Sequence, residues 1–307
     1  MPRQKRWVVR EGDGRTIAEI VKRAGEEERA VDEGRVFLGR RRVTRGSEAV
    51  RPGDEVRIGG VGAGAAAAAA WSVIWEREGL LACSKPAGMP TVADHAGASH
   101  ALVSLAADSV LRKASELFVT SRLDRDVSGV VVFATTPEAE ARLRTARADG
   151  RYVRRYVAIA AGDPKLEAWD APIGGGIDPR HRAAHGPEAK AARTHWAMVA
   201  RAGRFSLLAV EPQTGRTHQI RIHASHAGAP LLGDGDYGGP SRTTLPSGRV
   251  VALTRVALHA SRVSVPGAHG EVLVAEAPVP AELVRAWTDL GGASEAWDTA
   301  LSCDVGV

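Results

Sequence analysis

The chain has 307 residues, of which 44% are hydrophobic, and this is enough for one sizeable core and a smaller second domain. The formal net charge is +5 and only two cysteines occur, far apart, so we expect a reduced, cytoplasmic protein and exclude a disulfide-stabilised secreted one. No apolar stretch has bilayer length, and the basic start lacks the apolar core of a secretory signal, so we expect no membrane partner.

Residues 1–60 are predicted to form a small α/β domain. Ile17, Ile20 and Val21 have helical spacing, whereas 35–38 and 55–58 alternate in polarity and are separated by glycine and proline turns. The stretch from Arg35 to Arg45 holds five arginines and no acid. Such clusters fit phosphate contact, although a solvated surface of an arginine-rich chain explains them as well.

Residues 61–70, "VGAGAAAAAA", carry no charge and no large side chain, so they can pack little. We interpret them as a Gly/Ala linker, with a short alanine helix as the alternative.

Residues 71–283 are predicted to form the main domain. Two strands joined by a turn are expected in 71–92, a helix and then a strand or loop in 104–126, and a strand followed by a threonine-capped helix in 129–150. Further strands are expected in 155–162, 194–212, 215–228, 251–266 and 270–278. Because strands mostly adjoin strands, we predict an α+β fold with a mixed, mostly antiparallel sheet flanked by helices and loops. A helix is expected in 281–290, and 284–307 are assigned to a C-terminal tail of unknown role.

Several chemistries lack their motifs. There is no Cys-x-x-Cys pair, no Gly-x-Ser-x-Gly and no phosphate-binding Gly-Lys-Ser/Thr loop. His218, His223 and His226 could suggest a metal site, but a strand would place His218 and His223 on opposite faces, with no carboxylate interleaved. We therefore expect no metal and no cofactor.

The stretch "SRLDRDVSGVVVFA", residues 121–134, places two aspartates before an apolar run. Its Asp-x-Asp pattern is found in magnesium-dependent phosphatases, but there the apolar strand precedes the aspartates. The alternative is a carboxylate of this loop that a neighbouring guanidinium keeps ionised, and a surface ion pair is a third possibility. On a strand, Arg221 would share a face with Gln219 and His223 and could supply that guanidinium from the second basic segment, 215–223. Arg125 and Asp126 are interpreted as a local solvated pair.

Five stretches occur in the order found in RluA-type pseudouridine synthases, and the chain resembles that family over roughly residues 71–280. They are "CSKPAGMPT", "RLDRDVSGVVVFA", "RRYVAIAAG", "GRTHQIRIHASHAGAPLLGDGDYGG" and "VALHASRVSVP". "GRVFLGRRRV" and "VRPGDEVRI" resemble an RNA-binding domain first described in the small ribosomal subunit protein S-four, which often precedes this catalytic domain.

The resemblance implies a pseudouridine synthase fold and the isomerisation of uridine in RNA, by base flipping and without cofactor or metal. It implies Asp124, Tyr156 and Arg221 as catalytic residues. It also implies three RNA-binding residues in the main domain: Arg122 would fill the space left by the flipped nucleotide, Leu258 would line the pocket and Lys85 would lie near it. In the N-terminal domain the RNA-binding candidates are Arg35, Arg40, Arg41 and Arg42.

The chain departs from the family pattern at Ser121, where histidine is usual, at Val127, where threonine is usual, and at Arg154, where lysine is usual. The expected partner is rRNA, with tRNA as a second option, no DNA and a monomeric state. The alternative of another class is a non-catalytic RNA-binding or ribosome-assembly factor.

Overall fold

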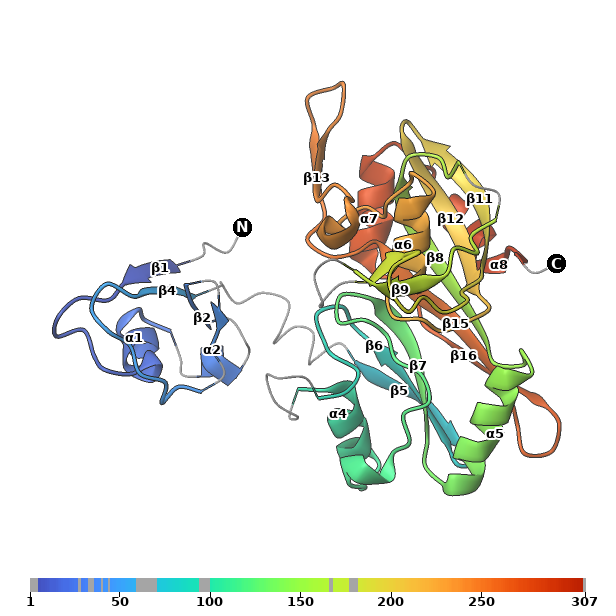
Figure 1. Cartoon of the computed structure of the whole chain (residues 1–307), viewed down its shortest axis with the longest axis horizontal. Helices are drawn as coiled ribbons and strands as arrows, with labels where there is room; N and C mark the ends of the chain where they lie inside the picture. The colour runs from blue at the N-terminus through green and yellow to red at the C-terminus, as the bar shows by residue number, and fades with distance from the viewer. Residues whose placement is uncertain are drawn as a thin grey trace.

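The computed structural model describes residues 5–26, 29–32, 36–39, 41–43, 45–58, 71–93, 100–165, 168–176 and 182–305 (Figure 1). The linker predicted at 61–70 lies outside the described residues, and so do Arg35 and Arg40. Arg41 and Arg42 are described only as a strand.

The N-terminal unit has a sheet with strand order β1-β4-β2-β3, from Lys5–Val8, Glu55–Ile58, Val36–Leu38 and Arg41–Arg42. Its helices are α1 (Ile17–Arg23) and α2 (Arg29–Asp32). Thr16 begins α1 through a capping box with Glu19, and Ile17, Ile20 and Val21 are buried in the core of this unit. The helix and the two strands predicted from periodicity are therefore confirmed.

The main domain is built on an eight-stranded sheet, counted over the described residues (Figure 1). The order is β11-β12-β8-β15-β7-β6-β5, with β16 paired to β15. The strands are Ser72–Arg77 (β5), Leu80–Lys85 (β6), Ser128–Ala134 (β7), Val153–Ala161 (β8), Thr194–Ala202 (β11), Phe205–Pro212 (β12), Leu258–Pro266 (β15) and Val272–Glu276 (β16). Only β15 and β7 pair in parallel among them, so the predicted mixed, mostly antiparallel α+β sheet is confirmed.

Smaller elements surround this sheet. They are α4 (Leu102–Ser109), η1 (Ala114–Glu116), β9 (Ile173–Gly175), β10 (Arg182–Ala184), η2 (Gly235–Tyr237), β13 (Arg242–Thr244) and β14 (Val250–Ala252). β9 pairs with β10 and β13 with β14. No helix among the described residues is long and apolar enough to cross a membrane.

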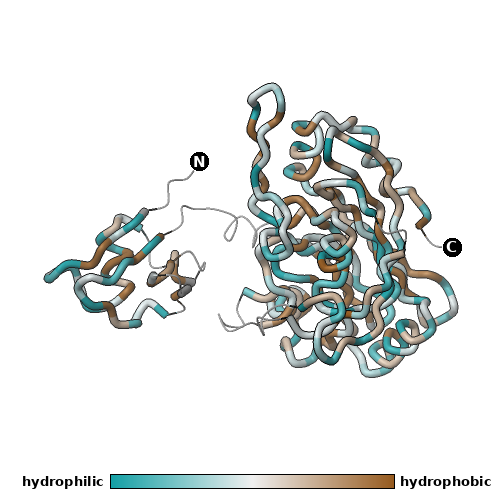
Figure 2. The backbone as a smooth tube through the Cα atoms, turned by 45° about the horizontal axis from the view of Figure 1, so that its top comes forward, coloured by the Kyte–Doolittle hydropathy of each residue, from teal (hydrophilic) through white to brown (hydrophobic). Residues whose placement is uncertain are grey.

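Alternating side chains of the sheet fill cores on its two faces. In β8, Tyr156 and Ala158 pack into the core that includes α4 and α6 (Gln219–His226), whereas Val157 and Ile159 pack toward α7 (Ala281–Asp289) and α8 (Ala296–Ser302). Since both faces are covered, all seven residues of β7 are buried. Figure 2 shows hydrophobic (brown) and hydrophilic (teal) stretches interspersed along the chain.

The end of β7 and the start of α5 (Pro137–Ala148) follow the predicted order of strand, cap and helix. The Thr136 side chain accepts the Ala139 N–H, and Pro137 occupies the first helical position. This helix packs Leu143 into a further core, formed with β7 and β6.

The strand predicted for 215–228 is wrong, because Gln219–His226 form helix α6. Polarity alternates from Gln219 to Ile222, but every residue from Gln219 to Ala224 is buried, so the alternation marks no inner and outer face. Gln219 accepts the Arg216 N–H and the Thr214 hydroxyl, which fixes the start of the helix.

The C-terminal boundary also needs correction, since residue 283 lies inside α7. Trp287 in α7 and Trp297 in α8 pack with Ile159 and Leu207 of the sheet. The described part of the predicted tail therefore belongs to the core of the main domain.

Candidate active site

A cavity of about 540 Å³ lies between the loop before β7, strand β8 and the start of α6. Five of the predicted site residues line it: Arg122, Asp124, Tyr156, Arg221 and Leu258. They come from four separate segments, so the fold brings together residues up to 136 positions apart, the separation of Arg122 from Leu258.

The loop that carries Asp124 is held by the segment after β6. Thr91 donates its hydroxyl to the Leu123 carbonyl at 2.8 Å and accepts the Leu123 N–H at 3.1 Å. The Gly88 N–H bonds the Arg125 carbonyl at 2.8 Å, and the Arg125 Nε returns a bond to the Gly88 carbonyl at 3.0 Å. Asp124 is thereby fixed from both sides of its own position in the chain.

Lys85 belongs to this clamp and is 1% exposed, which differs from the expectation that it binds RNA. Its ammonium donates to the carbonyls of Pro86, Met89 and Arg125 at 3.0, 2.7 and 3.1 Å. Burial, followed by the charge of Arg255, lowers the pKa of Lys85 to about 7. Lys85 thus holds the Asp124 loop through these buried hydrogen bonds and does not line the cavity.

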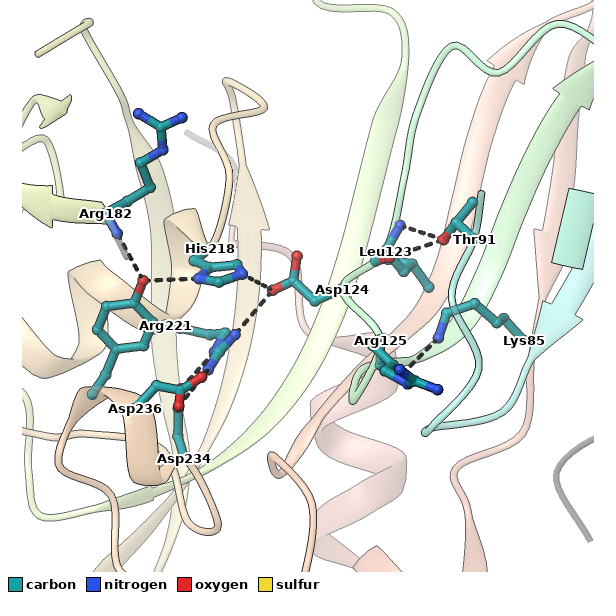
Figure 3. A network of polar contacts seen from close by, with 11 residues as sticks. Lys85, Thr91, Leu123, Asp124, Arg125, Arg182, His218, Arg221, Asp234 and Asp236 are labelled. Carbon is teal, nitrogen blue, oxygen red and sulfur yellow. Dashed lines mark hydrogen bonds and ion pairs between the residues drawn. The ribbon is translucent and has the colours of Figure 1, made fainter. Parts of the chain in front are cut away.

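Arg221 approaches Asp124 from α6, as Figure 3 shows. Its Nη1 lies 3.5 Å from Asp124 Oδ2, so the predicted pairing exists, although it is long. The shorter contacts of Arg221 go to two residues that the sequence did not reveal as site residues. Asp234 accepts hydrogen bonds from Arg221 Nε and Nη2 at 2.8 and 2.7 Å, and Asp236 accepts one from Arg221 Nη2 at 2.8 Å.

These contacts decide the electrostatics of Arg221. Burial alone would lower the pKa of Arg221, but the hydrogen bonds and charges of Asp234 and Asp236 raise it, so the guanidinium is permanently charged. The guanidinium also lies over the Tyr237 ring, 4.9 Å from its centroid. In the sequence, the signal for these partners is the pair of aspartates in "GDGDYGG" at 233–239.

His218 also borders the site. It precedes α6 with φ 57° in the left-handed region, and its Nε2 lies 3.8 Å from Asp124 Oδ2. Its Nδ1 lies 2.8 Å from the Tyr237 hydroxyl. Burial lowers the pKa of His218 and outweighs the charge of Asp124, which acts in the opposite direction. The neutral imidazole is therefore favoured.

Tyr156 and Leu258 form the apolar wall of the cavity and are 7% and 3% exposed. Burial raises the pKa of Tyr156, so its phenol stays neutral. Arg122 is exposed at the rim. Asp124 itself keeps 27% of its side chain exposed, so the carboxylate is open to a ligand in the cavity.

The second aspartate of the loop does not share this site. Asp126 lines a different hollow, together with Arg255 and Glu282, so the two aspartates do not converge on one ion. In the described part of the chain, no group of three or more His, Cys, Asp and Glu side chains is placed to hold a metal. The arrangement therefore offers one exposed carboxylate, a fixed cation and an apolar wall.

Comparisons with known proteins identify the family of the chain. A family model described as RNA pseudouridylate synthase matches residues 79–226. The chain is 35% identical over 218 residues to the uncharacterized RNA pseudouridine synthase YhcT of Bacillus subtilis, across 69% of each chain. The chain belongs to the RNA pseudouridylate synthase family. Its main domain is thus an isomerase, and the predicted RluA-type resemblance of this domain is confirmed.

A second relative of this pseudouridine synthase is the ribosomal large subunit pseudouridine synthase D of Nitrosomonas europaea, 34% identical over 219 residues. The alignment covers 69% of this chain and 62% of that protein, which is less than two thirds of its length. The structure of human RNA pseudouridylate synthase domain containing 4 matches with a TM-score of 0.58 and 21% identity, over 72% of this chain and 93% of that chain. This likeness confirms the pseudouridine synthase fold. The likeness of residues 1–60 to the S-four domain stays a prediction.

The three departures from the family pattern have structural settings. Ser121 contributes a hydrogen bond to Tyr152, and Val127 is buried in the core that includes α4 and α6. Arg154 donates to the carbonyls of Pro212 and Thr214 at 3.1 and 2.7 Å. Each residue has a packing or bonding partner of its own.

Proposed function

We propose that the chain converts specific uridines of RNA to pseudouridine and that Asp124 is the catalytic carboxylate. The observation that carries this proposal is its place in the cavity: a partly exposed carboxylate 3.5 Å from a buried guanidinium and beside Tyr156. The reaction breaks the bond from the ribose carbon to the base nitrogen and forms one to a base carbon, so the product is an isomer of the substrate. A carboxylate at the ribose carbon is the group that glycosidic chemistry commonly uses.

Asp124 has two options in this reaction. It can attack the ribose carbon as a nucleophile, or it can remove a ribose proton while the base leaves. Both need the ionised carboxylate, which the permanent charge of Arg221 favours. In the first case the bond between Asp124 and the ribose breaks as the carbon–carbon bond forms, and in the second Asp124 returns the proton to the ribose. In both, the proton lost from the base carbon balances the proton gained at the freed nitrogen, so no co-reactant is required.

The other residues have roles in holding the base. A stacked uridine is out of reach of the carboxylate, so the nucleotide must leave the stack and enter the cavity. Tyr156 and Leu258 offer the base an apolar surface. Arg122 is exposed at the rim, where a long planar side chain can occupy the space left in the RNA.

The proposed substrate is rRNA, with tRNA as the less favoured option. The relative from Nitrosomonas europaea is named for the large ribosomal subunit. Residues 1–60, with their arginine-rich stretch, are proposed to bind RNA through its phosphates, and the enzyme is proposed to act in the cytoplasm as a monomer.

The test is to map pseudouridine in rRNA and tRNA from a strain lacking the protein, before and after incubation with purified enzyme. New pseudouridine is expected at defined sites, and Asp124→Asn should abolish it. Asp126→Asn is the matched control, because Asp126 is two positions away but lines another hollow, and it should retain activity. The proposal fails if no RNA gains pseudouridine or if Asp124→Asn remains active. Rescue of a deletion strain by Asp124→Asn would favour a non-catalytic RNA-binding factor.

A further inference from the structure

Six arginines lie between positions 142 and 155, and the sequence gives no reason to separate them. The structure does separate them. Arg142 donates to the Glu78 carbonyl at 2.7 Å, on another side of the helix from the hollow described below. Arg144 pairs with Glu140 at 2.6 Å and Arg151 with Asp149 at 2.8 Å, while Arg155 reaches Asp304 at 3.0 Å and Glu211 at 3.4 Å. These three arginines have acidic partners within the protein.

Arg147 and Arg154 form no ion pair with any described acidic residue. Arg147 donates to the Thr120 carbonyl, and Arg154 to two carbonyls through Nη2. Arg154 is only 9% exposed, and its buried Nε has no hydrogen-bond partner among the described residues. Burial and the charge of Arg154 lower the pKa of Arg147, as expected for two neighbouring cations without a counter-ion.

The two guanidiniums face one hollow of about 210 Å³, which Arg216 also lines. A Cβ on Gly215 would lie 2.5 Å from Arg147 Nη2 and 3.4 Å from Arg154 Nη1, so the absence of a side chain there leaves both guanidinium ends uncovered. Glu211 lines the hollow as well, but its oxygens accept hydrogen bonds from Gln213 and Arg155. The hollow is therefore electropositive.

This hollow continues the active-site cavity. The two share their lining at Arg147, Arg154, Pro212, Thr214, Gly215 and Arg216. A nucleotide chain with one base beside Asp124 has a phosphate within a short reach of its ribose, and the shared wall is the place where that phosphate can meet a cation.

We propose that Arg147, Arg154 and Arg216 form a subsite for the RNA phosphodiester adjacent to the uridine held in the cavity. This inference rests on the proposed function for the identity of the base, and it adds a defined anchor for the backbone. The donor geometry of a guanidinium matches the oxygens of a phosphate. A phosphate would also supply Arg147 and Arg154 with the negatively charged partner that no described acidic residue provides. Backbone contacts of this kind fix register without reading sequence.

The test uses the full chain and a labelled single-stranded pentauridylate, with binding followed by fluorescence anisotropy over a range of salt concentrations. Arg147→Gln should weaken binding about tenfold at low salt and make the slope of log K against log salt shallower by about 0.7, the value for one phosphate contact on a single strand. Arg144→Gln is the matched control from the same helix, with a 73% exposed side chain paired to Glu140, and it should bind like the wild type.

A pentauridylate with uncharged methylphosphonate linkages completes the cycle. Wild-type binding should drop with this probe, and the difference between wild type and Arg147→Gln should vanish, because the partner charge is gone. Equal binding by Arg147→Gln and Arg144→Gln overturns the subsite, and so does a difference that persists on the neutral probe. If Arg147→Gln does not fold, Arg216→Gln, an exposed position on the same hollow, carries the same test.

These outcomes are separate from those of the proposed function. The binding measurement needs no isomerisation, so an inactive wild-type protein with the expected salt slopes would refute the function and leave the subsite. An active protein with unchanged slopes would refute the subsite alone.

Discussion

Asp234→Asn is expected to destabilise the main domain by about 3 kcal/mol, because it removes one partner of a buried ion pair. The side chains of Asp234 and Arg221 are 1% and 6% exposed and make two hydrogen bonds of 2.7 and 2.8 Å. Removing one partner of such a pair typically costs about 3–5 kcal/mol. Asparagine keeps one oxygen that can accept a guanidinium N–H, which places the cost at the lower end.

Asp236→Asn is the matched control. Asp236 accepts from the same Nη2 at an equal 2.8 Å, but its side chain is 55% exposed, so its loss should cost about 0–1 kcal/mol. Urea unfolding monitored by tryptophan fluorescence measures both. With an m-value of about 2 kcal/mol/M, the midpoint should fall by about 1.5 M for Asp234→Asn and by at most about 0.5 M for Asp236→Asn. Equal losses for the two variants would show that burial does not set the strength of these pairs.

Three further outcomes are expected. Gly129→Ala should destabilise the main domain by about 3 kcal/mol, since φ is 125° and the new Cβ would lie 2.2 Å from the Ala260 carbonyl oxygen; Gly88→Ala, with nothing within 4 Å, should lose only about 1 kcal/mol in the same urea titration. Thr136→Ala should lower the free energy of unfolding by about 1 kcal/mol through loss of the α5 cap, and an unchanged thermal midpoint would contradict this role. Burial lowers the pKa of His259 to about 4, so below about pH 6.5 the unfolded chain binds a proton at this residue that the folded protein does not. The free energy of unfolding should therefore decrease by roughly 2 kcal/mol between pH 6.5 and 5. His259→Gln should make this decrease smaller.

Elements whose start and end are marked by nearby residues, such as a capping residue or a proline, could be predicted from the sequence. The apolar run 130–134 followed by Thr136 and Pro137 is strand, cap and helix in the structure, because the cap and the proline act within a few residues. Helix α6 could not be predicted in this way. Its residues are buried on all sides, so the contrast between inner and outer faces, on which periodicity depends, is missing.

The site follows the same division. The residue types Asp124, Tyr156 and Arg221 were available from the ordered stretches, and the structure brings all three to one cavity. The bidentate partner of Arg221 could not be predicted, because the pairing with Asp234 depends on how the segment after α6 folds back over it. Lys85 was placed near the site, but only its three carbonyl contacts reveal that it supports the loop from inside.

By itself, the sequence determined the α+β class, the family and the identity of the candidate carboxylate, since these depend on local patterns and on the order of short stretches along the chain. Only the tertiary structure decided which charges are free to act. Arg144 and Arg147 are three positions apart on one helix and look alike in the sequence, yet one pairs with Glu140 while the other faces an electropositive hollow. The physical reason is that the effect of a charge depends on its burial and on neighbours distant in the chain, and both are fixed by folding.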